Sequence, residues 1–122
     1  MVSVEALRKF ALSFEETEEV PHFERTSFRV KKKIFATLDL KNNLACLMLS
    51  EVDQSVFCAF DKTIIYPVPN KWGKQGATYV DLKKVRLDLF KDVLTCAYCK
   101  AAPKTLANRY KKPQTDLKNN LI

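Results

Sequence analysis

PVPNKWGKQGATYVDL, residues 67–82, is the stretch on which the organisation of this chain depends. It contains both glycines of the protein, its only tryptophan and two of its five prolines. Glycine and proline set unusual backbone dihedral angles, so a chain that is nearly free of glycine elsewhere has one loop whose shape matters. The loop is basic and aromatic, and it leads into residues 77–80, whose alternation predicts a strand. It is therefore the best candidate for a functional surface.

Length and composition are those of one globular domain. The chain has 122 residues, of which 47% are apolar and 29% charged, and a chain of this size buries enough surface to fold without a metal or a disulfide. No apolar run approaches the ~20 residues that span a bilayer. Met1 is followed by Val-Ser-Val-Glu rather than by a basic and then an apolar segment. We therefore expect a soluble, cytoplasmic protein with no membrane partner.

The charge of the chain is unevenly distributed. The net charge is +7, but residues 1–24 hold six acidic and two basic side chains, a local charge of −4, so residues 25–122 carry +11. A positive potential of this kind suits partners that carry phosphate groups. The alternative interpretation is that the net charge only keeps a small protein soluble.

No set of residues indicates a reaction, a cofactor or a metal. His22 is the only histidine, so a cysteine–histidine pair would need it to meet Cys99, the one thiol expected on a polar helix face. Cys96 and Cys99 form a C-x-x-C near a helix end, where the dipole disfavours a thiolate, and no second pair stands at the spacing of a zinc site. We therefore expect a non-enzymatic protein without cofactor or metal, its four cysteines reduced.

Apolar periodicity predicts three helices. The first covers residues 4–13, with Ser3 as its N-cap. The second begins at the N-cap Ser50, the start of a sequence with the form of a capping box. Its expected buried face consists of Val52, Val56, Ala59 and Phe60. The last extends over about residues 83–101, and its wide apolar arc predicts packing across a sheet.

The segments between the predicted helices have the residue patterns of strands. The five expected strands are residues 26–30, 34–40, 44–49, 63–66 and 77–80. The glutamate-rich residues 14–25 are interpreted as a solvated connection. Residues 31–33 form a tight hairpin of three lysines, and residues 41–43 form a second turn because asparagine tolerates positive φ. The second strand is expected to place on one face Ile34, Ala36, Leu38 and Leu40.

The short turns between consecutive strands imply antiparallel pairing. The predicted fold class is therefore α+β, a two-layer domain with a five-stranded antiparallel sheet and elements in the order α-β3-α-β2-α. We expect one domain over residues 1–103 and a basic C-terminal tail over residues 104–122 that is partly helical or disordered. No feature of the sequence requires a second copy, and a monomer is expected.

Two loops carry the residues that could bind nucleic acid. Lysines neutralise phosphates, and a tryptophan between lysines can stack on a base or lie over a sugar. The candidate residues are Lys31, Lys32, Lys33, Lys71, Trp72 and Lys74. In the alternative interpretation Trp72 folds back into the core and the lysines only solvate the loop tips. The sequence GKQG of residues 73–76 lacks the spacing of a phosphate-binding loop, so its glycines are expected to shape a turn.

The sequence resembles the MmcQ/YjbR family over about residues 4–102. The match is most specific in F-x-V-x-x-K-I-F-A, which begins at Phe28, and in the loop that contains Trp72 and leads to Val80. Three departures from the family pattern point to a subgroup. Phe14-Glu15-Glu16 stands where members carry Leu-Pro-Gly, and the hairpin tip lacks the glycine that members often have. In the loop, Lys71 directly precedes the tryptophan, where members often carry a basic residue and then a histidine before it.

The resemblance implies a fold like that of secretion chaperones and a role as a "double-wing" DNA-binding protein, and it implies no enzymatic activity. Together with the lysine loops, it leads us to expect a cytoplasmic DNA-binding protein with little sequence preference. The alternative is a protein-interaction module that uses the sheet face or the last helix and binds no nucleic acid. An exposed indole at Trp72 would favour nucleic acid, whereas a buried one would favour protein binding.

Overall fold

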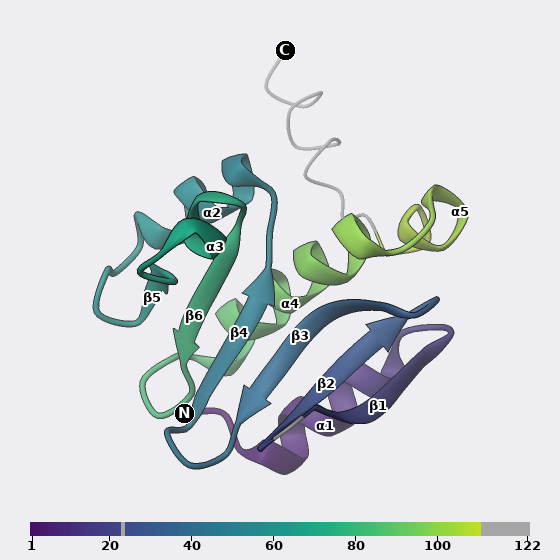
Figure 1. The fold of residues 1–122 in the computed structure, drawn as a ribbon, viewed down its shortest axis with the longest axis horizontal. Coiled ribbons are helices and arrows are strands. Elements are labelled where there is room, and N and C mark those ends of the chain that lie inside the picture. The colour runs from purple at the N-terminus through teal and green to yellow at the C-terminus, as the bar shows by residue number, and fades with distance from the viewer. Residues whose placement is uncertain (23, 111–122) are drawn as a thin grey trace.

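Six antiparallel strands and five helices make up the part of the chain that the computed structural model describes, residues 1–22 and 24–110 (Figure 1). In chain order the elements are α1 (Val4–Ser13), β1 (Thr17–His22), β2 (Arg25–Val30), β3 (Lys33–Asp39), β4 (Leu44–Met48), α2 (Glu51–Cys58), β5 (Ile65–Pro67), α3 (Lys71–Lys74), β6 (Ala77–Asp81), α4 (Leu87–Ala101) and α5 (Lys104–Ala107). The expected disorder or helix over residues 111–122 lies outside the described residues.

The sheet has the order β1-β2-β3-β4-β6-β5, and all its neighbouring strands are antiparallel. The α+β class is therefore as predicted, but the sheet has six strands instead of five. The additional strand, β1, lies within residues 14–25, which the sequence analysis interpreted as a solvated connection. It pairs with β2 along its whole length, from Thr17 opposite Val30 to His22 opposite Arg25. An edge strand tolerates glutamates and a proline because one side of it faces solvent, so its composition resembles that of a loop.

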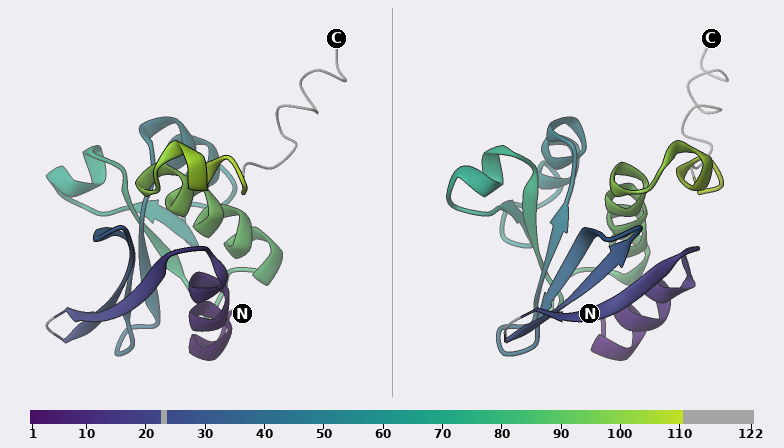
Figure 2. Two further views of the ribbon diagram at one scale, coloured as in Figure 1. Left: turned by 90° about the vertical axis from the view of Figure 1, so that its right-hand side faces the viewer. Right: turned by 45° about the vertical axis from the view of Figure 1, so that its right-hand side comes forward.

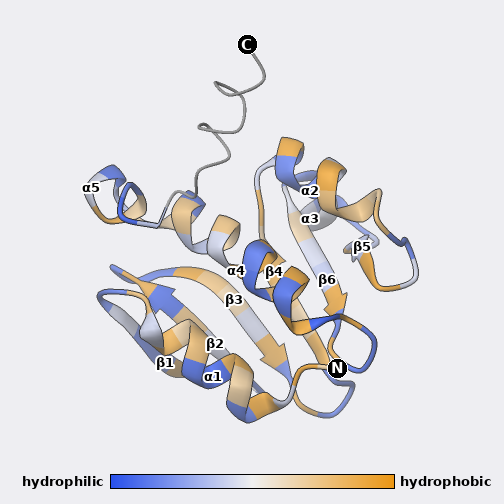
Figure 3. Cartoon of the chain, turned by 180° about the vertical axis from the view of Figure 1, so that it is seen from behind, coloured by the Kyte–Doolittle hydropathy of each residue, from blue (hydrophilic) through white to orange (hydrophobic). Residues whose placement is uncertain are grey.

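Helices α1 and α4 cover one face of the sheet (Figures 2 and 3). The side chains of that face are fully buried, as Leu38, Leu47 and Val80 illustrate. Tyr98 of α4 completes an aromatic cluster there, stacked on Phe14 with a centroid distance of 4.4 Å. The short α5 extends the same core, to which it contributes Leu106 and Ala107. Among the described residues, no helix is both long and apolar enough to cross a membrane.

Strand β3 contains an irregularity that the period-two pattern did not predict. Phe28 pairs with Ala36, but the next residue, Arg29, pairs with Ile34, so Phe35 is an extra residue on β3. Because of this bulge Phe35 and Ala36 are both buried, whereas Ile34 is only half-buried. Leu40 is exposed because it lies in the turn that follows β3. The expectation that Ile34 lies on the same face of the strand as Ala36 is therefore wrong, and Leu40 lies beyond the end of the strand.

Helix α2 begins as predicted but buries a different face. The hydroxyl of Ser50 accepts a hydrogen bond from the Asp53 backbone N–H at 3.1 Å, which confirms the cap. The four residues of the expected core face are all exposed: Val52 (72%), Val56 (54%), Ala59 and Phe60 (65%). The helix contacts the rest of the molecule through the buried Phe57 and through Gln54, whose amide donates to the Gly73 carbonyl at 2.8 Å.

Candidate nucleic-acid interface

The topology brings both lysine loops to the same end of the sheet. Strands β2 and β5 end there, and β3 and β6 begin there, because every neighbouring pair is antiparallel. We call residues 31–33 the hairpin tip and residues 68–76 the α3 tip. Strand β4 lies between the two hairpins and leads into α2 at this same end. The two tips, which are far apart in sequence, therefore lie at the same end of the strands, one between β2 and β3 and the other between β5 and β6 (Figure 1).

The hairpin tip is a two-residue turn with an unusual backbone. Lys31 has φ 49° and Lys32 has φ 70°, so both lie in the left-handed region that tight hairpin turns require. Asparagine and glycine usually occupy such positions because other side chains are strained there. Lys33 is already the first residue of β3. The turn is therefore short, and its lysine side chains are exposed.

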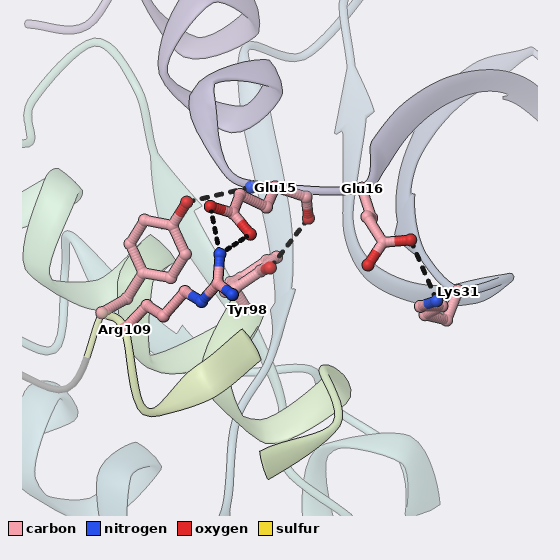
Figure 4. A network of polar contacts seen from close by, with 6 residues as sticks. Glu15, Glu16, Lys31, Tyr98 and Arg109 are labelled. Atoms are coloured by element: carbon pink, nitrogen blue, oxygen red, sulfur yellow. Dashed lines mark hydrogen bonds and ion pairs between the residues drawn. The ribbon is translucent and has the colours of Figure 1, made fainter. Parts of the chain in front are cut away.

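One lysine of the hairpin tip has an acidic partner. The ammonium of Lys31 lies 2.9 Å from the Glu16 carboxylate, and both side chains are about half exposed (Figure 4). Within residues 1–22 and 24–110, Lys31 is the only one of the five candidate lysines that forms an ion pair. An exposed pair is weak, so a phosphate can compete for Lys31 at a small cost.

Glu15, the neighbour of Glu16, is itself held in place by the C-terminal part of the domain (Figure 4). The guanidinium of Arg109 contacts both carboxylate oxygens of Glu15 at 2.7 and 2.6 Å. The Glu15 backbone N–H donates to the Tyr110 hydroxyl at 3.0 Å, and the Tyr98 hydroxyl donates to the Glu15 carbonyl at 2.8 Å. Burial raises the pKa of Tyr98 to about 12, and the hydrogen bond that Arg109 donates to the Glu15 carboxylate raises the pKa of Arg109. The sequence did not predict this network because Glu15 is more than eighty residues away from Tyr98, Arg109 and Tyr110.

The α3 tip depends on both of the glycines in the chain. A Cβ atom at Gly73 would lie 1.9 Å from the Val68 carbonyl oxygen, and one at Gly76 would lie 1.8 Å from that of Leu49. Gly76 also has φ 106°, which side-chain-bearing residues rarely adopt. The glycines therefore shape a turn, as expected from the sequence, and they also permit a close backbone approach that the sequence did not predict.

Within the α3 tip the chain forms one short helix that the sequence analysis described only as a loop. Asn70 begins it, since its side-chain oxygen accepts a hydrogen bond from the Trp72 N–H at 2.8 Å. The indole of Trp72 is 53% exposed, so the interpretation in which it folds back into the core is wrong. The ammonium of Lys71 lies 5.9 Å from the centre of the indole ring, within the range of a cation–π contact. Lys74 is exposed at the other end of the helix.

A cleft of about 490 Å³ opens beside this helix. Its lining consists of Gln54, Pro67, Val68, Pro69, Asn70, Lys71, Gly73 and Lys74. Two lysines on its wall make the cleft suited to an anionic group. Gln54 keeps its shape because its amide donates to the carbonyls of Gly73 and Ala77 and to the Thr78 hydroxyl, at 2.8, 3.1 and 3.1 Å.

The four cysteines, which could in principle serve catalysis or bind a metal, are all half-buried. Cys96 and Cys99 are half-buried on α4. Burial raises the pKa of the thiols of Cys46 and Cys58, so both are protonated at neutral pH. Among the described residues, no three histidine, cysteine or acidic side chains gather as ligands of one metal ion.

Comparisons with known proteins agree with the fold. Residues 12–100 match the family model described as YjbR. Among solved structures, the chain is similar to the crystal structure of Deinococcus radiodurans protein DR2400, which carries the family-model domain DUF419. The identity is 20%, the TM-score is 0.72, and the match covers 90% of this chain and 88% of that chain. At this identity the likeness shows the shared fold alone. A search of curated proteins found no match.

Proposed function

The chain belongs to the YjbR family, and from this premise we propose that it is a non-enzymatic, monomeric DNA-binding protein of the cytoplasm. The hairpin tip and the α3 tip act as two wings on the phosphate backbone. The contacting residues are Lys31, Lys32, Lys33, Lys71, Trp72 and Lys74. Flexible lysines neutralise phosphates without reading base edges, so binding has little sequence preference.

The single observation that carries this proposal is the environment of Trp72. Its indole is on the surface, it is flanked by two exposed lysines, and it stands at the same end of the sheet as the lysines of the hairpin tip. A large apolar ring that is held in solvent between cations suits a ligand that has both phosphates and flat rings or sugars. The cleft lined by Lys71 and Lys74 provides room for a phosphate.

The experiment measures the affinity for a fluorescent DNA duplex by anisotropy at several salt concentrations. If about four phosphates are neutralised, log K falls with log salt concentration at a slope near −3 to −4. Replacing the three lysines of the hairpin tip, or Lys71 and Lys74, by alanine lowers the affinity and flattens the slope. The matched control is the variant with alanine at Lys83 and Lys84, two exposed lysines that follow the opposite end of β6. Absence of binding at low salt, or equal loss in the control, would contradict the proposal.

A second candidate function, a protein-interaction module without nucleic-acid binding, is favoured by one observation. The apolar side chains of Val52, Val56 and Phe60 are exposed on one face of α2, and exposed apolar patches commonly mark protein contacts. This surface differs from the sheet face and the last helix, which the sequence analysis suggested for that role. The DNA titration separates the two candidates, because an interaction module alone gives no salt-dependent DNA binding.

A further inference from the structure

A row of side chains crosses the face of the sheet that is turned away from α1 and α4. The strand register aligns Thr37 with Cys46, Cys46 with Tyr79 and Tyr79 with Tyr66. We call these four residues the open face. Their sequence neighbours Leu47 and Val80 are fully buried on the helix side, so alternation directs the row away from it. All four side chains are half-buried, which leaves part of each accessible.

The two tyrosines of the open face form an aromatic pair at the base of the α3 tip. Their ring centroids are 5.7 Å apart and their planes meet at 60°, an edge-to-face arrangement. Tyr66 immediately precedes Pro67, where the chain leaves the sheet, and Tyr79 is the third residue of β6, where it returns. Trp72 and its lysines therefore extend the same aromatic and basic surface. Helix α3 lies on the opposite side of the sheet from α1 and α4, as both views of Figure 2 illustrate.

Several charged side chains lie near the open face. Lys71 and Lys74 lie in the α3 tip, which follows the end of β5 shortly after Tyr66, and Arg29 is half-buried on β2, with its Nε donating to the Ser27 hydroxyl at 3.0 Å. The carboxylate of Asp39 on the same face is 3.6 Å from the Arg25 guanidinium, which balances its charge. A negatively charged chain that crosses the row thus has cations near it on β2 and in the α3 tip.

We propose that the open face binds single-stranded nucleic acid, with bases stacked on Tyr79 and Tyr66 and the backbone directed toward the α3 tip. This inference rests on the proposed function and names the substrate class. Base faces are available for stacking only when bases are unpaired, whereas a duplex presents mainly phosphates and groove edges. The row crosses four strands spaced about 4.8 Å apart. A four-stranded sheet with aromatic residues can stack two or three bases.

The experiment compares a fluorescent single-stranded oligothymidine of twelve nucleotides with a duplex of the same length, at the same salt concentration. We expect the single strand to bind more tightly. Tyr79→Ala lowers its affinity about tenfold, in the range of one lost base–aromatic contact, and leaves duplex affinity within about twofold. Tyr79→Phe preserves the ring and is the matched control. Tyr66→Ala, on the edge strand β5, is a second variant with a smaller expected loss. Circular dichroism verifies that each variant is folded.

Photo-crosslinking of the unaltered protein to an oligonucleotide that contains 5-iodouracil gives a readout that needs no variant. Crosslinks to peptides with Tyr66 or Tyr79 support the proposal, and crosslinks confined to other elements overturn it. Equal affinity for single strand and duplex, with no effect of Tyr79→Ala, also overturns it but leaves the proposed DNA binding intact. If neither oligonucleotide binds at low salt, the proposed function fails and this inference fails with it.

Discussion

The hairpin tip and the α3 tip lie at one end of the sheet and carry three and two lysines, but they are held by different interactions. The hairpin tip is a two-residue turn between adjacent strands, and its left-handed residues are lysines. The α3 tip needs glycines at two points of close approach, to Val68 and to Leu49, and a glutamine from another helix. Local backbone geometry therefore determines the first tip, whereas contacts between distant segments determine the second. A positive charge shared by two loops does not imply equal tolerance to substitution.

The largest expected effect is at Gly76 of the α3 tip. Gly76→Ala places a Cβ atom 1.8 Å from the Leu49 carbonyl oxygen, at a residue with φ 106°. We expect a loss of about 3 kcal/mol or more in the free energy of unfolding, because the backbone at both sites must shift. Urea unfolding followed by circular dichroism measures it. Ala77→Gly, one residue later in β6, is a control for strand position, with an expected loss of about 1 kcal/mol. A Gly76→Ala variant as stable as the unaltered protein would show that the close approach is not required.

The next effect concerns Tyr98, whose hydroxyl donates a hydrogen bond to Glu15, the neighbour of the residue that pairs with Lys31. Because the pKa of Tyr98 in the folded state is about 12, above its unfolded value near 10, the folded state favours the neutral hydroxyl. The stability that this shift provides is complete below about pH 10 and is lost as the pH rises toward 12, an effect of up to about 2 kcal/mol. Tyr98→Phe removes this alkaline loss, and at pH 7 it costs about 1 kcal/mol for the hydrogen bond to Glu15.

Unfolding free energies of Tyr98→Phe and of the unaltered protein between pH 7 and 11.5 test this prediction. Tyr79→Phe on the open face is the control, for which we expect the alkaline loss of the unaltered protein. If the free energy of unfolding falls with pH equally in Tyr98→Phe and in the unaltered protein, the loss of stability at alkaline pH is not due to Tyr98.

The same substitution is expected to act with opposite sign at the two tips. Lys32→Gly at the hairpin tip relieves a residue with φ 70° and raises the free energy of unfolding by about 0.5–1 kcal/mol. Lys74→Gly replaces a lysine of α3 by glycine, which has a lower helix propensity. It lowers the free energy of unfolding by roughly 0.5–1 kcal/mol. Both variants lose one exposed lysine, so each is the control for the other. Thermal and urea unfolding measure the difference, and a change of the same sign at both tips would contradict the comparison.

The smallest expected effect is on the ion pair of the hairpin tip. Glu16→Gln releases Lys31 from its 2.9 Å contact and changes the free energy of unfolding by less than about 0.5 kcal/mol. At low salt it raises DNA affinity about twofold, because one more lysine is available to a phosphate. Glu18→Gln removes the same charge from an exposed residue of β1 and is the control. If both variants change the affinity equally, general charge rather than the Lys31 contact is responsible.

Much of the fold could be predicted because its signals are local. Ser3 and Ser50 are N-caps in the structure as expected, and Asn43 has the positive φ (53°) anticipated for the second turn. The hairpin over residues 26–40 follows from alternation on both sides of a short polar turn. The same segment carried the resemblance to the MmcQ/YjbR family, which the match to the YjbR family model confirms.

The errors have physical causes that a local pattern cannot reveal. Strand β1 has the composition of a loop because the edge of a sheet is half in water. The apolar spacing on α2 was correct as a helical pattern, but Phe57 and Gln54 on the opposite side hold the helix to the domain. The tight approach of Gly73 and Gly76 to other backbone segments was not predictable, although their concentration in one loop marked that loop as special.

The fold class, most elements, the family and the positions of the lysines and of Trp72 along the chain could all be read from the residues alone. Only the tertiary structure decided that both lysine loops share one end of the sheet, that the indole is exposed, and that Tyr66 and Tyr79 lie side by side on the open face. The physical reason is the range of the interactions. Caps, turns and periodicity act within a few residues, whereas strand order, register and burial depend on segments far apart in the chain.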